Sequence, residues 1–282
     1  MTSTPPLLAA VVGTPITHSL SPAIYRAAFA AQNIVGDYVA IDANAASIAS
    51  VFAEVQSQDV RGLSVTMPLK EAIISLLQSV DEDAALLNAV NCVDFNNGTA
   101  TGHNTDGDGC CDALEQQGGA LLGGAHAVVL GAGGTARSVA LALGRRGARV
   151  AIINRTTEKA EELVRMLAPA AQEAGGDIVM GSLSEIARAG VLVNTTSVGM
   201  NSDELPISAN VLHRNLVVLD AVYSPMDTAL LKAARQAGAV TVDGLWMLIQ
   251  QARRQCVYQF GWNPDAVPMR EAAERELAAR RK

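Results

Sequence analysis

Four short polar clusters in the first part of the chain contain residue types that could bind a small hydroxylated acid and move a proton on it. They lie at residues 19–22, 64–70, 91 and 104–106. Each cluster follows an apolar stretch, where a strand is expected to end and a loop or helix to begin. Their hydroxyl, amide, ammonium and carboxylate groups suit the binding of a polyhydroxylated acid and proton transfer at one of its oxygens.

The first cluster has the composition of a carboxylate site. Ser19 and Ser21 flank the start of a helix expected over residues 22–32. Two hydroxyls next to the free N–H groups of a helix N-terminus would bind an anion. The alternative is that Ser21 only caps the helix.

Lys70 and Asp106 are the candidates for proton transfer. Pro68 is expected to begin a helix over residues 68–78, which would direct Lys70 toward the strand ends, where α/β sheets bind ligands. Partial desolvation would favour proton transfer by this lysine, and Asp106 would hold its ammonium group. The alternatives are a surface lysine and a helix-capping aspartate. His18 and His103 are weaker candidates for a catalytic base.

A glycine-rich loop between an apolar strand and a helix indicates nucleotide binding. The pattern G-x-G-x-x-A follows residues 126–130 and precedes a helix expected over 135–146. In such a loop the glycines allow a tight turn and close approach of a pyrophosphate, and a small third residue lets the helix pack on the strand. Its residues are Gly131, Ala132, Gly133, Gly134, Thr135 and Ala136.

The end of the next strand, residues 149–153, indicates which dinucleotide binds. A carboxylate here would bind the ribose 2′-OH of NAD. The chain instead has Asn154, Arg155 and Thr156, with Lys159 one turn later. An arginine fork suits a 2′-phosphate, so the sequence predicts NADP as the cofactor. The alternative is that Arg155 is a solvated residue.

The order of elements predicts an α/β protein with two domains. The first hundred residues alternate strands (7–12, 38–41, 63–65, 91–95) with helices (22–32, 45–57, 68–78, 83–87), which implies a mostly parallel sheet. Residues 110–243 form a doubly wound, Rossmann-type unit with strands expected at 126–130, 149–153, 178–180, 191–194 and 217–220. The tail from residue 245 is helical and is expected to pack back on the first unit. The predicted domains are 1–109 with 244–282, for substrate, and 110–243, for NADP.

Composition excludes several other functions. The net charge of −7 and the small aromatic fraction (4%) argue against nucleic-acid binding. No pattern of His and Cys has metal-ligand spacing, so no metal is expected. The chain also shows no signal peptide or membrane span, and its four cysteines are expected to be free thiols, which predicts a cytoplasmic protein. Monomer and homodimer both remain open.

Taken in order, these motifs resemble the shikimate dehydrogenase family over nearly the whole chain. The matching segments are residues 13–22, 65–70, 89–91, 102–107, 154–156, 194–200, 243–245, 247–248 and 251–252. The resemblance implies a substrate domain completed by C-terminal helices, with a Rossmann domain between. It also implies the reversible reduction of 3-dehydroshikimate to shikimate by NADPH, in aromatic amino-acid biosynthesis.

The resemblance assigns residue roles as well. Ser19 and Ser21 would hold the carboxylate, and Lys70 with Asp106 would transfer the proton. Contacts to ring hydroxyls would come from Ser64, Thr66, Asn91, Asp106 and Gln251, with Tyr223 nearby. Further cofactor contacts would come from Thr195, Thr196, Ser197, Gly199, Met200, Gly244 and Met247.

Several residues depart from the family pattern. Ser64 stands where asparagine is common, and Trp246 interrupts a Gly-Leu-Gly-Met motif. Cys256 and Gln259 stand where an aromatic residue and a tryptophan are common. These departures leave two alternatives open: a paralogue that acts on quinate or an aminated shikimate, and a protein that senses NADP without catalysis.

Overall fold

The computed structural model describes residues 6–58, 60–96 and 98–280. The chain forms two compact units, each with its own sheet. The first unit comprises the described residues up to 105 and those from 252 onward, and the second comprises residues 106–251. The division therefore falls inside helix α8 (Gly244–Phe260), whose first part belongs to the second unit.

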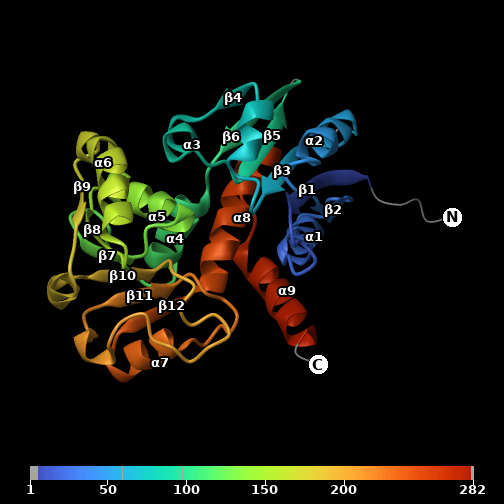
Figure 1. Ribbon diagram of the computed structural model, residues 1–282. Helices are drawn as coiled ribbons and strands as arrows, with labels where there is room; N and C mark the ends of the chain where they lie inside the picture. Colours follow the sequence, from blue (N-terminus) through green and yellow to red (C-terminus); the bar gives the residue numbers. More distant parts are fainter. Residues whose placement is uncertain (1–5, 59, 97, 281–282) are drawn as a thin grey trace. The chain divides into compact units, whose positions relative to one another are not determined.

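The first unit is built on a six-stranded mixed sheet with the order β2-β1-β3-β5-β6-β4 (Figure 1). Strands β1, β2 and β3 are parallel, whereas β5 runs antiparallel to both β3 and β6. The strands are β1 (Leu7–Gly13), β2 (Asp37–Asp42), β3 (Gly62–Val65), β4 (Ser79–Val80), β5 (Cys92–Asn96) and β6 (Thr99–His103).

Helices cover this sheet with apolar side chains at helical spacing. Ile24, Tyr25, Ala28 and Phe29 are the buried residues of α1, so one stripe of that helix faces the core. In the same way α2 buries Ile48, Phe52 and Val55, and α9 lies beside α1 (Figure 1). The helices are α1 (Ser21–Ala31), α2 (Ile48–Ser57), η1 (Ala72–Leu76), α3 (Glu82–Leu87) and α9 (Ala266–Ala279).

The second unit is a parallel sheet with the order β12-β11-β10-β7-β8-β9. Counted from β7, this is the strand order 3-2-1-4-5-6 of dinucleotide-binding domains, read from the opposite edge. Its strands are almost wholly apolar because helices cover both faces. They are β7 (His126–Leu130), β8 (Arg149–Ile153), β9 (Asp177–Met180), β10 (Val191–Asn194), β11 (Val217–Asp220) and β12 (Val240–Asp243).

Close packing of α4 (Asp106–Gln116) on α5 (Gly134–Arg145) depends on a missing side chain. A Cβ atom at Gly107 would lie only 2.0 Å from the carbonyl oxygen of Ser138. Beyond this contact, Arg146 donates to Asp108 at 2.8 Å and Asp112 at 3.4 Å. The remaining helices of the unit are α6 (Thr157–Glu173), η2 (Leu183–Arg188), η3 (Ala209–Val211) and α7 (Ala229–Gln236).

The α/β architecture predicted from the sequence is confirmed, and strands 149–153, 191–194 and 217–220 have the predicted bounds. The short strands β4, β6 and β12 were not predicted. The β6 sequence, Thr-Ala-Thr-Gly-His, lacks the alternation of large apolar residues that predicts a strand, although the Asn-Gly pair before it is a strong hairpin signal. Among the described helices, none has the length and apolarity needed to cross a membrane.

The predicted helix over residues 68–78 is wrong. This segment contains a turn around Lys70 and the short 3₁₀ helix η1. The carbonyl of Lys70 accepts from Val90 N at 2.8 Å, and Ile74 N donates to the carbonyl of Glu71. Bonding to a neighbouring segment thus replaces the helical hydrogen bond at this position.

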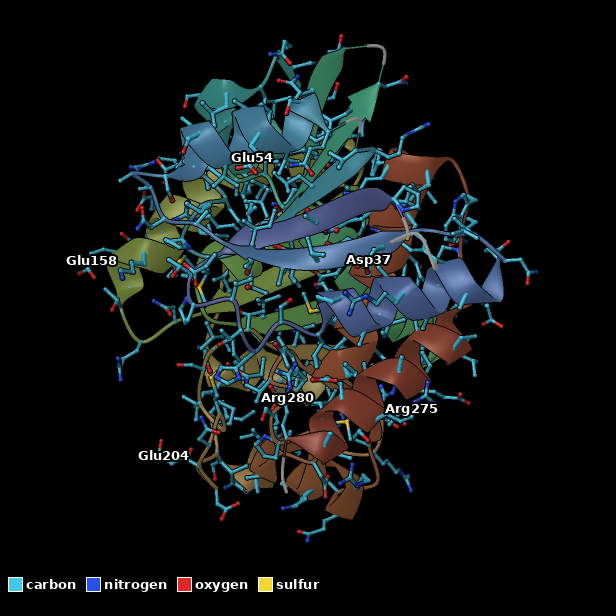
Figure 2. All side chains as sticks on the ribbon, turned by 90° about the vertical axis from the view of Figure 1, so that its right-hand side faces the viewer. Asp37, Glu54, Glu158, Glu204, Arg275 and Arg280 are labelled. Carbon is cyan, nitrogen blue, oxygen red and sulfur yellow. The ribbon has the colours of Figure 1, made fainter. Side chains whose placement is uncertain are left out.

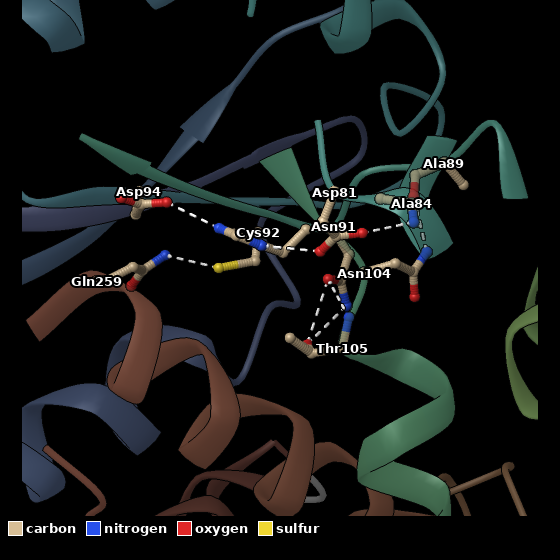
Figure 3. Close-up of polar contacts among 10 residues, drawn as sticks. Asp81, Ala84, Ala89, Asn91, Cys92, Asp94, Asn104, Thr105 and Gln259 are labelled. Atoms are coloured by element: carbon tan, nitrogen blue, oxygen red, sulfur yellow. Dashed lines mark hydrogen bonds and ion pairs between the residues drawn. The ribbon is translucent and has the colours of Figure 1, made fainter. Parts of the chain in front are cut away.

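A hydrogen-bonded bridge through His103 joins β5, β6 and the N-cap of α3 in the first unit. His103 on β6 contacts Asp81 through Nδ1 and Asp94 through Nε2, both at 2.8 Å, and its ring stacks on Tyr258. Asp81 also accepts from Ala84 N as the N-cap of α3 (Figure 3). Burial alone would lower the pKa of His103, but the hydrogen bonds and charges of Asp81 and Asp94 raise it above its ordinary value.

We predict that His103→Gln destabilises the protein more at pH 6 than at pH 9. A raised folded-state pKa means that the imidazolium contribution is fully present below the unfolded pKa of about 6.5 and is lost as pH rises through the folded pKa. Loss of charged hydrogen bonds should cost about 2 kcal/mol at pH 6. Urea unfolding of both proteins across this range measures the difference, and a gap that widens with rising pH would contradict the assignment. Asp94→Asn, which removes one charge, should flatten the pH dependence.

Candidate active site

The loop that carries Ser19 and Ser21 connects β1 to α1 and is folded into a tight turn. Ser19 N donates to the carbonyl of Ile16 at 2.9 Å, and Ser21 N donates to Ser19 Oγ at 3.2 Å. Both serines are partly exposed. The N-cap of α1 is Leu20 and makes no side-chain cap, so Ser21 is not the capping residue. Hydroxyls and helix N–H groups lie together here, as a carboxylate site requires.

Arg280, directly after α9, is distant from this loop in sequence but binds to it. Figure 2 labels Arg280 on the ribbon. Its guanidinium donates to the carbonyl oxygens of His18 at 2.7 Å and Ser19 at 3.1 Å. The same group donates to Glu276 at 3.0 Å. The two carbonyl oxygens carry partial negative charge, which would repel a bound anion, and the arginine neutralises it. The guanidinium also adds positive charge beside the serines.

Thr66 and Lys70 lie in the loop that follows β3. Thr66 N donates to the carbonyl of Val12 at 2.9 Å, which ties this loop to the end of β1. A Cβ atom at Gly13 would lie 2.4 Å from Thr66 Cγ2, so the two loops are in close contact. Both Thr66 and Lys70 are partly buried. The carboxyl ends of β1 and β3 thus bring the serine loop and the lysine loop to one edge of the sheet.

Asn91 and Thr105 form a buried pair between β5 and β6 (Figure 3). Thr105 N donates to Asn91 Oδ1 at 2.8 Å, and Asn91 Nδ2 donates to Thr105 Oγ1 at 3.1 Å. These bonds fix the orientation of the Asn91 amide. Asn104 donates to the carbonyl of Ala89 at 2.8 Å and so secures the same loop.

Ser64 is buried among polar side chains that the sequence did not single out. Its hydroxyl donates to Gln255 Oε1 at 2.5 Å and accepts from Tyr38 at 2.6 Å. Tyr25 also donates to Gln255 Oε1, at 2.7 Å, and its ring stacks on Tyr38 with centroids 4.1 Å apart. Burial raises the pKa of Tyr38, while hydrogen bonds to Ser64 and Ser21 oppose the rise, so Tyr38 joins two predicted substrate contacts.

The histidine alternatives are not supported by this geometry. Both ring nitrogens of His103 are bonded to carboxylates. His18 is exposed and takes part in the loop through its backbone carbonyl. A general base needs a free nitrogen within reach of a substrate proton, and His103 does not have one.

Asp106, Tyr223 and Gln251 belong to the second unit. Asp106 is buried as the first residue of α4. Tyr223 is partly buried just after β11, and Gln251 packs where a Cβ atom at Gly109 would approach its backbone to 2.6 Å. The pairing of Asp106 with Lys70 of the first unit stays a prediction.

The glycine loop of the second unit lies between β7 and α5, as predicted. Gly131 has a φ of +113°, a conformation that favours glycine, and a Cβ atom there would lie 2.7 Å from Thr195 Oγ1. Apart from adjoining residues of the loop and helix, no atom of the described residues lies within 4 Å of the Cβ positions of Gly133 and Gly134, and both glycines are exposed. The N-cap of α5 is Gly133, which has no side chain that could occupy the N–H groups of the helix N-terminus. This exposed backbone fits the pyrophosphate of a dinucleotide.

The loop after β8 presents two exposed cations. Arg155 and Lys159 are exposed, and α6 begins at Thr157 without a side-chain cap on Thr156. Asn154 Nδ2 donates to the carbonyl of Thr156 at 2.8 Å, which shapes the turn. The backbone N–H of Gly131 donates to the carbonyl of Ile153 at 2.8 Å, so this loop adjoins the glycine loop. The two cations and the helix N-terminus fit a 2′-phosphate.

A third loop, after β10, adjoins the glycine loop. Thr195 Oγ1 donates to the carbonyl of Leu130 at 2.6 Å. Thr196 Oγ1 donates to Asn194 Oδ1 at 2.7 Å, and Asn194 in turn donates to Asp220 at 2.9 Å. Burial raises the pKa of Asp220, which also accepts from Thr228 at 2.7 Å. This buried network supports the loop that continues through Ser197, Gly199 and Met200. Gly244 and Met247 lie farther along, in the buried start of α8.

Sequence reasoning missed three residues of the first unit that hold the predicted substrate contacts: Tyr25, Tyr38 and Gln255. Thr105 lies in the predicted polar cluster at residues 104–106, but no role was predicted for it, and the structure shows that it holds the Asn91 side chain. The tyrosines and Gln255 lie at helix or strand positions that are also typical of ordinary core residues, so their spacing carried no signal.

Two family models match successive parts of the chain. The model of the shikimate dehydrogenase substrate binding domain matches residues 11–93, and the shikimate / quinate 5-dehydrogenase model matches residues 113–200. The NADP(+) shikimate dehydrogenase of Thermococcus kodakarensis is 41% identical over 264 residues, which cover 93% of this chain and 94% of that protein.

Solved structures show the same similarity. Shikimate 5-dehydrogenase of Thermus thermophilus, in complex with NADP(H) and shikimate, has a TM-score of 0.83 and 35% identity, covering 96% of this chain and 99% of that one. The ligand-free 5-ketofructose reductase of a Gluconobacter strain has a TM-score of 0.88 and 29% identity, covering 96% and 98%. By its sequence and its structure, the chain belongs to the shikimate dehydrogenase family.

Proposed function

We propose that this protein catalyses the reversible, NADP-dependent reduction of 3-dehydroshikimate to shikimate, a step of aromatic amino-acid biosynthesis. The observation that carries the proposal is the 41% identity to an NADP(+) shikimate dehydrogenase over 93% of the chain. The Thermus relative, whose structure contains NADP(H) and shikimate, supports the same assignment. The serine, lysine and amide groups at one sheet edge of the first unit have the chemistry that such a substrate needs.

The proposed cofactor domain, residues 110–243, lies within the second unit, which extends from 106 to 251. The proposed substrate domain is residues 1–109 with 244–282. Gly131 to Ala136 would bind the pyrophosphate, and Asn154, Arg155, Thr156 and Lys159 would bind the adenosine 2′-phosphate. The exposed glycine backbone and the two exposed cations support these roles. The nicotinamide would be lined by Thr195, Thr196, Ser197, Gly199, Met200, Gly244 and Met247.

The substrate would be held by its carboxylate and its ring hydroxyls. Ser19 and Ser21, with the first N–H groups of α1, are proposed for the carboxylate. Hydroxyl contacts are proposed for Thr66, Asn91, Asp106 and Gln251, with Tyr223 close by. The fixed orientation of the Asn91 amide supports its role, because a donor and an acceptor are held in place before substrate binds.

When bound, NADPH supplies the hydride that adds to the ketone carbon. The carbonyl oxygen then becomes an alkoxide and must receive a proton. Lys70 is proposed to donate this proton from its ammonium group, and to take it back in the oxidation direction. Asp106 would hold the ammonium group in place.

The cysteines support a reducing compartment such as the cytoplasm. Cys92, Cys110, Cys111 and Cys256 are all buried free thiols. Buried thiols that do not pair are usual in proteins of the reducing cytosol. The proposed partners are the two small molecules alone, for a monomer or a homodimer that binds neither nucleic acid nor membrane.

The test of the function is a rate assay with purified protein, followed at the absorbance of reduced nicotinamide. Shikimate, quinate and 5-ketofructose would each be offered with the NADP and NAD couples. We expect shikimate with NADP⁺ to give the largest kcat/KM. A preference for quinate would favour a paralogue of altered specificity, and NADP binding with no turnover would favour a sensor protein.

Lys70→Ala should lower kcat by about 10²–10⁴ with little change in the KM for shikimate, since the lysine acts mainly on the proton in the transition state. Steady-state kinetics in both directions measure this effect. Lys232→Ala, at an exposed position of α7, is the matched control and should behave as wild type. Turnover of Lys70→Ala near the wild-type rate would remove Lys70 from the chemistry.

Arg155→Ala should weaken NADPH binding by about tenfold or more, the effect expected for loss of a charged hydrogen bond, and leave NADH binding nearly unchanged. Fluorescence titration with the two reduced cofactors gives both dissociation constants. Arg165→Ala, an exposed arginine of α6, is the control. An equal loss for both cofactors would show that Arg155 does not bind the 2′-phosphate.

A further inference from the structure

Gln255 is a buried glutamine of α8 whose entire hydrogen-bonding capacity is used within the first unit. Its side-chain oxygen accepts from Tyr25 at 2.7 Å and from Ser64 at 2.5 Å. Its amide nitrogen donates to the carbonyl of Asn91 and to Thr105 Oγ1, both at 3.3 Å. A carboxamide has two acceptor sites and two N–H donors, so no further partner is needed.

The orientation of this amide is determined by its surroundings. The carbonyl oxygen of Asn91 can only accept, so it must face the nitrogen of Gln255 rather than the oxygen. The hydroxyls of Tyr25 and Ser64 then donate to the oxygen. With Gln255 only 5% exposed, water cannot substitute for these partners at low cost.

This arrangement changes what Ser64 can do. A serine hydroxyl has one proton, and Ser64 gives it to Gln255 while accepting from Tyr38. Ser64 is 6% exposed and has no second proton to offer a substrate hydroxyl. Its contribution to the site is therefore assigned to its bond with Gln255 and not to donation toward a substrate.

The Gln255 carboxamide is thus hydrogen-bonded to three segments that carry or hold predicted substrate-binding residues. Ser64 lies on β3, Asn91 directly precedes β5, and Thr105 follows β6 and holds the Asn91 side chain. We propose that Gln255 is a positioning residue that sets the geometry of Asn91 for the substrate ring. This inference rests on the proposed function, since it concerns the affinity for shikimate.

The same helix provides a matched control. Gln259 lies one turn farther along α8, is 2% exposed, and donates to the carbonyl of Val93 at 3.4 Å and to Cys92 Sγ at 3.6 Å (Figure 3). Its side-chain oxygen has no hydrogen-bond partner among the described residues. Gln259 is therefore buried to a similar degree, but its hydrogen bonds within the described parts of the chain go to no predicted substrate residue.

The test compares Gln255→Met with Gln259→Met, since methionine keeps the length of the side chain and removes its hydrogen bonds. We expect Gln255→Met to raise the KM and the dissociation constant for shikimate about ten- to hundredfold, as for a misplaced buried polar contact. The KM for NADP⁺ should stay within about threefold. Gln259→Met should lower thermal stability and leave the KM for shikimate unchanged, which separates positioning from folding.

A double-mutant cycle with Ser64→Ala tests the route through Gln255. If Ser64 acts only through Gln255, the double variant should have the same KM as Gln255→Met, because effects within one network are not additive. Multiplied effects would show that Ser64 contacts substrate directly and would overturn the proposal. If Gln255→Met does not fold, Tyr25→Phe removes one donor to Gln255 and keeps the ring, and it should raise the KM for shikimate by a smaller factor.

Two other outcomes are informative. An unchanged KM in Gln255→Met, or an equal rise in Gln259→Met, would overturn the positioning role while the wild type still turns over shikimate. A wild type that neither binds nor oxidises shikimate would instead refute the proposed function. Calorimetric titration of each variant with shikimate gives the dissociation constant without any turnover.

Discussion

Parallel strands end at the same edge of a sheet, and both units of this protein depend on that constraint. In the first unit, β1 and β3 end together, so the loop with Ser19 and Ser21 adjoins the loop with Thr66. In the second, β7, β8 and β10 end together, and the loops after β8 and β10 adjoin the glycine loop. Residues distant in sequence thus become neighbours because the strands that carry them end together, and hydrogen bonds such as Thr66 N to the carbonyl of Val12 then join the loops.

Placing polar groups at such an edge buries some of them, and each buried group needs a partner. The first unit satisfies this requirement with Gln255, Asn91 and Thr105. The second uses Asn194 and Asp220, which lie under the loop that begins with Thr195. In the first unit this network holds the Asn91 amide, and in the second it holds the loop that begins with Thr195, so these groups are fixed in position before any ligand arrives.

A structural feature of this protein can be predicted from its sequence when the interacting residues are close together along the chain, and not when they are far apart. Strands such as β8 and β10 are apolar runs bounded by polar or glycine residues, and their bounds follow from local pattern. The turn at Lys70 could not be predicted, because its carbonyl is bonded to Val90, which is distant in sequence. Gln255 was missed for the same reason, because its hydrogen-bond partners lie between residues 25 and 105, far from it in sequence. Its helical spacing alone indicates only a core position.

Two residues that stabilise the first unit are synthesised only after the whole of the second unit. Gln255 and Arg280 follow residues 106–251, which form the whole of the second unit. At about 5–20 residues per second, a ribosome needs roughly seven to thirty seconds to add that segment. During this interval Ser64, Asn91 and Thr105 already exist, but the carboxamide that pairs with them does not. We therefore expect the second unit to fold first. The first unit can complete its fold only after α8 and α9 have been synthesised.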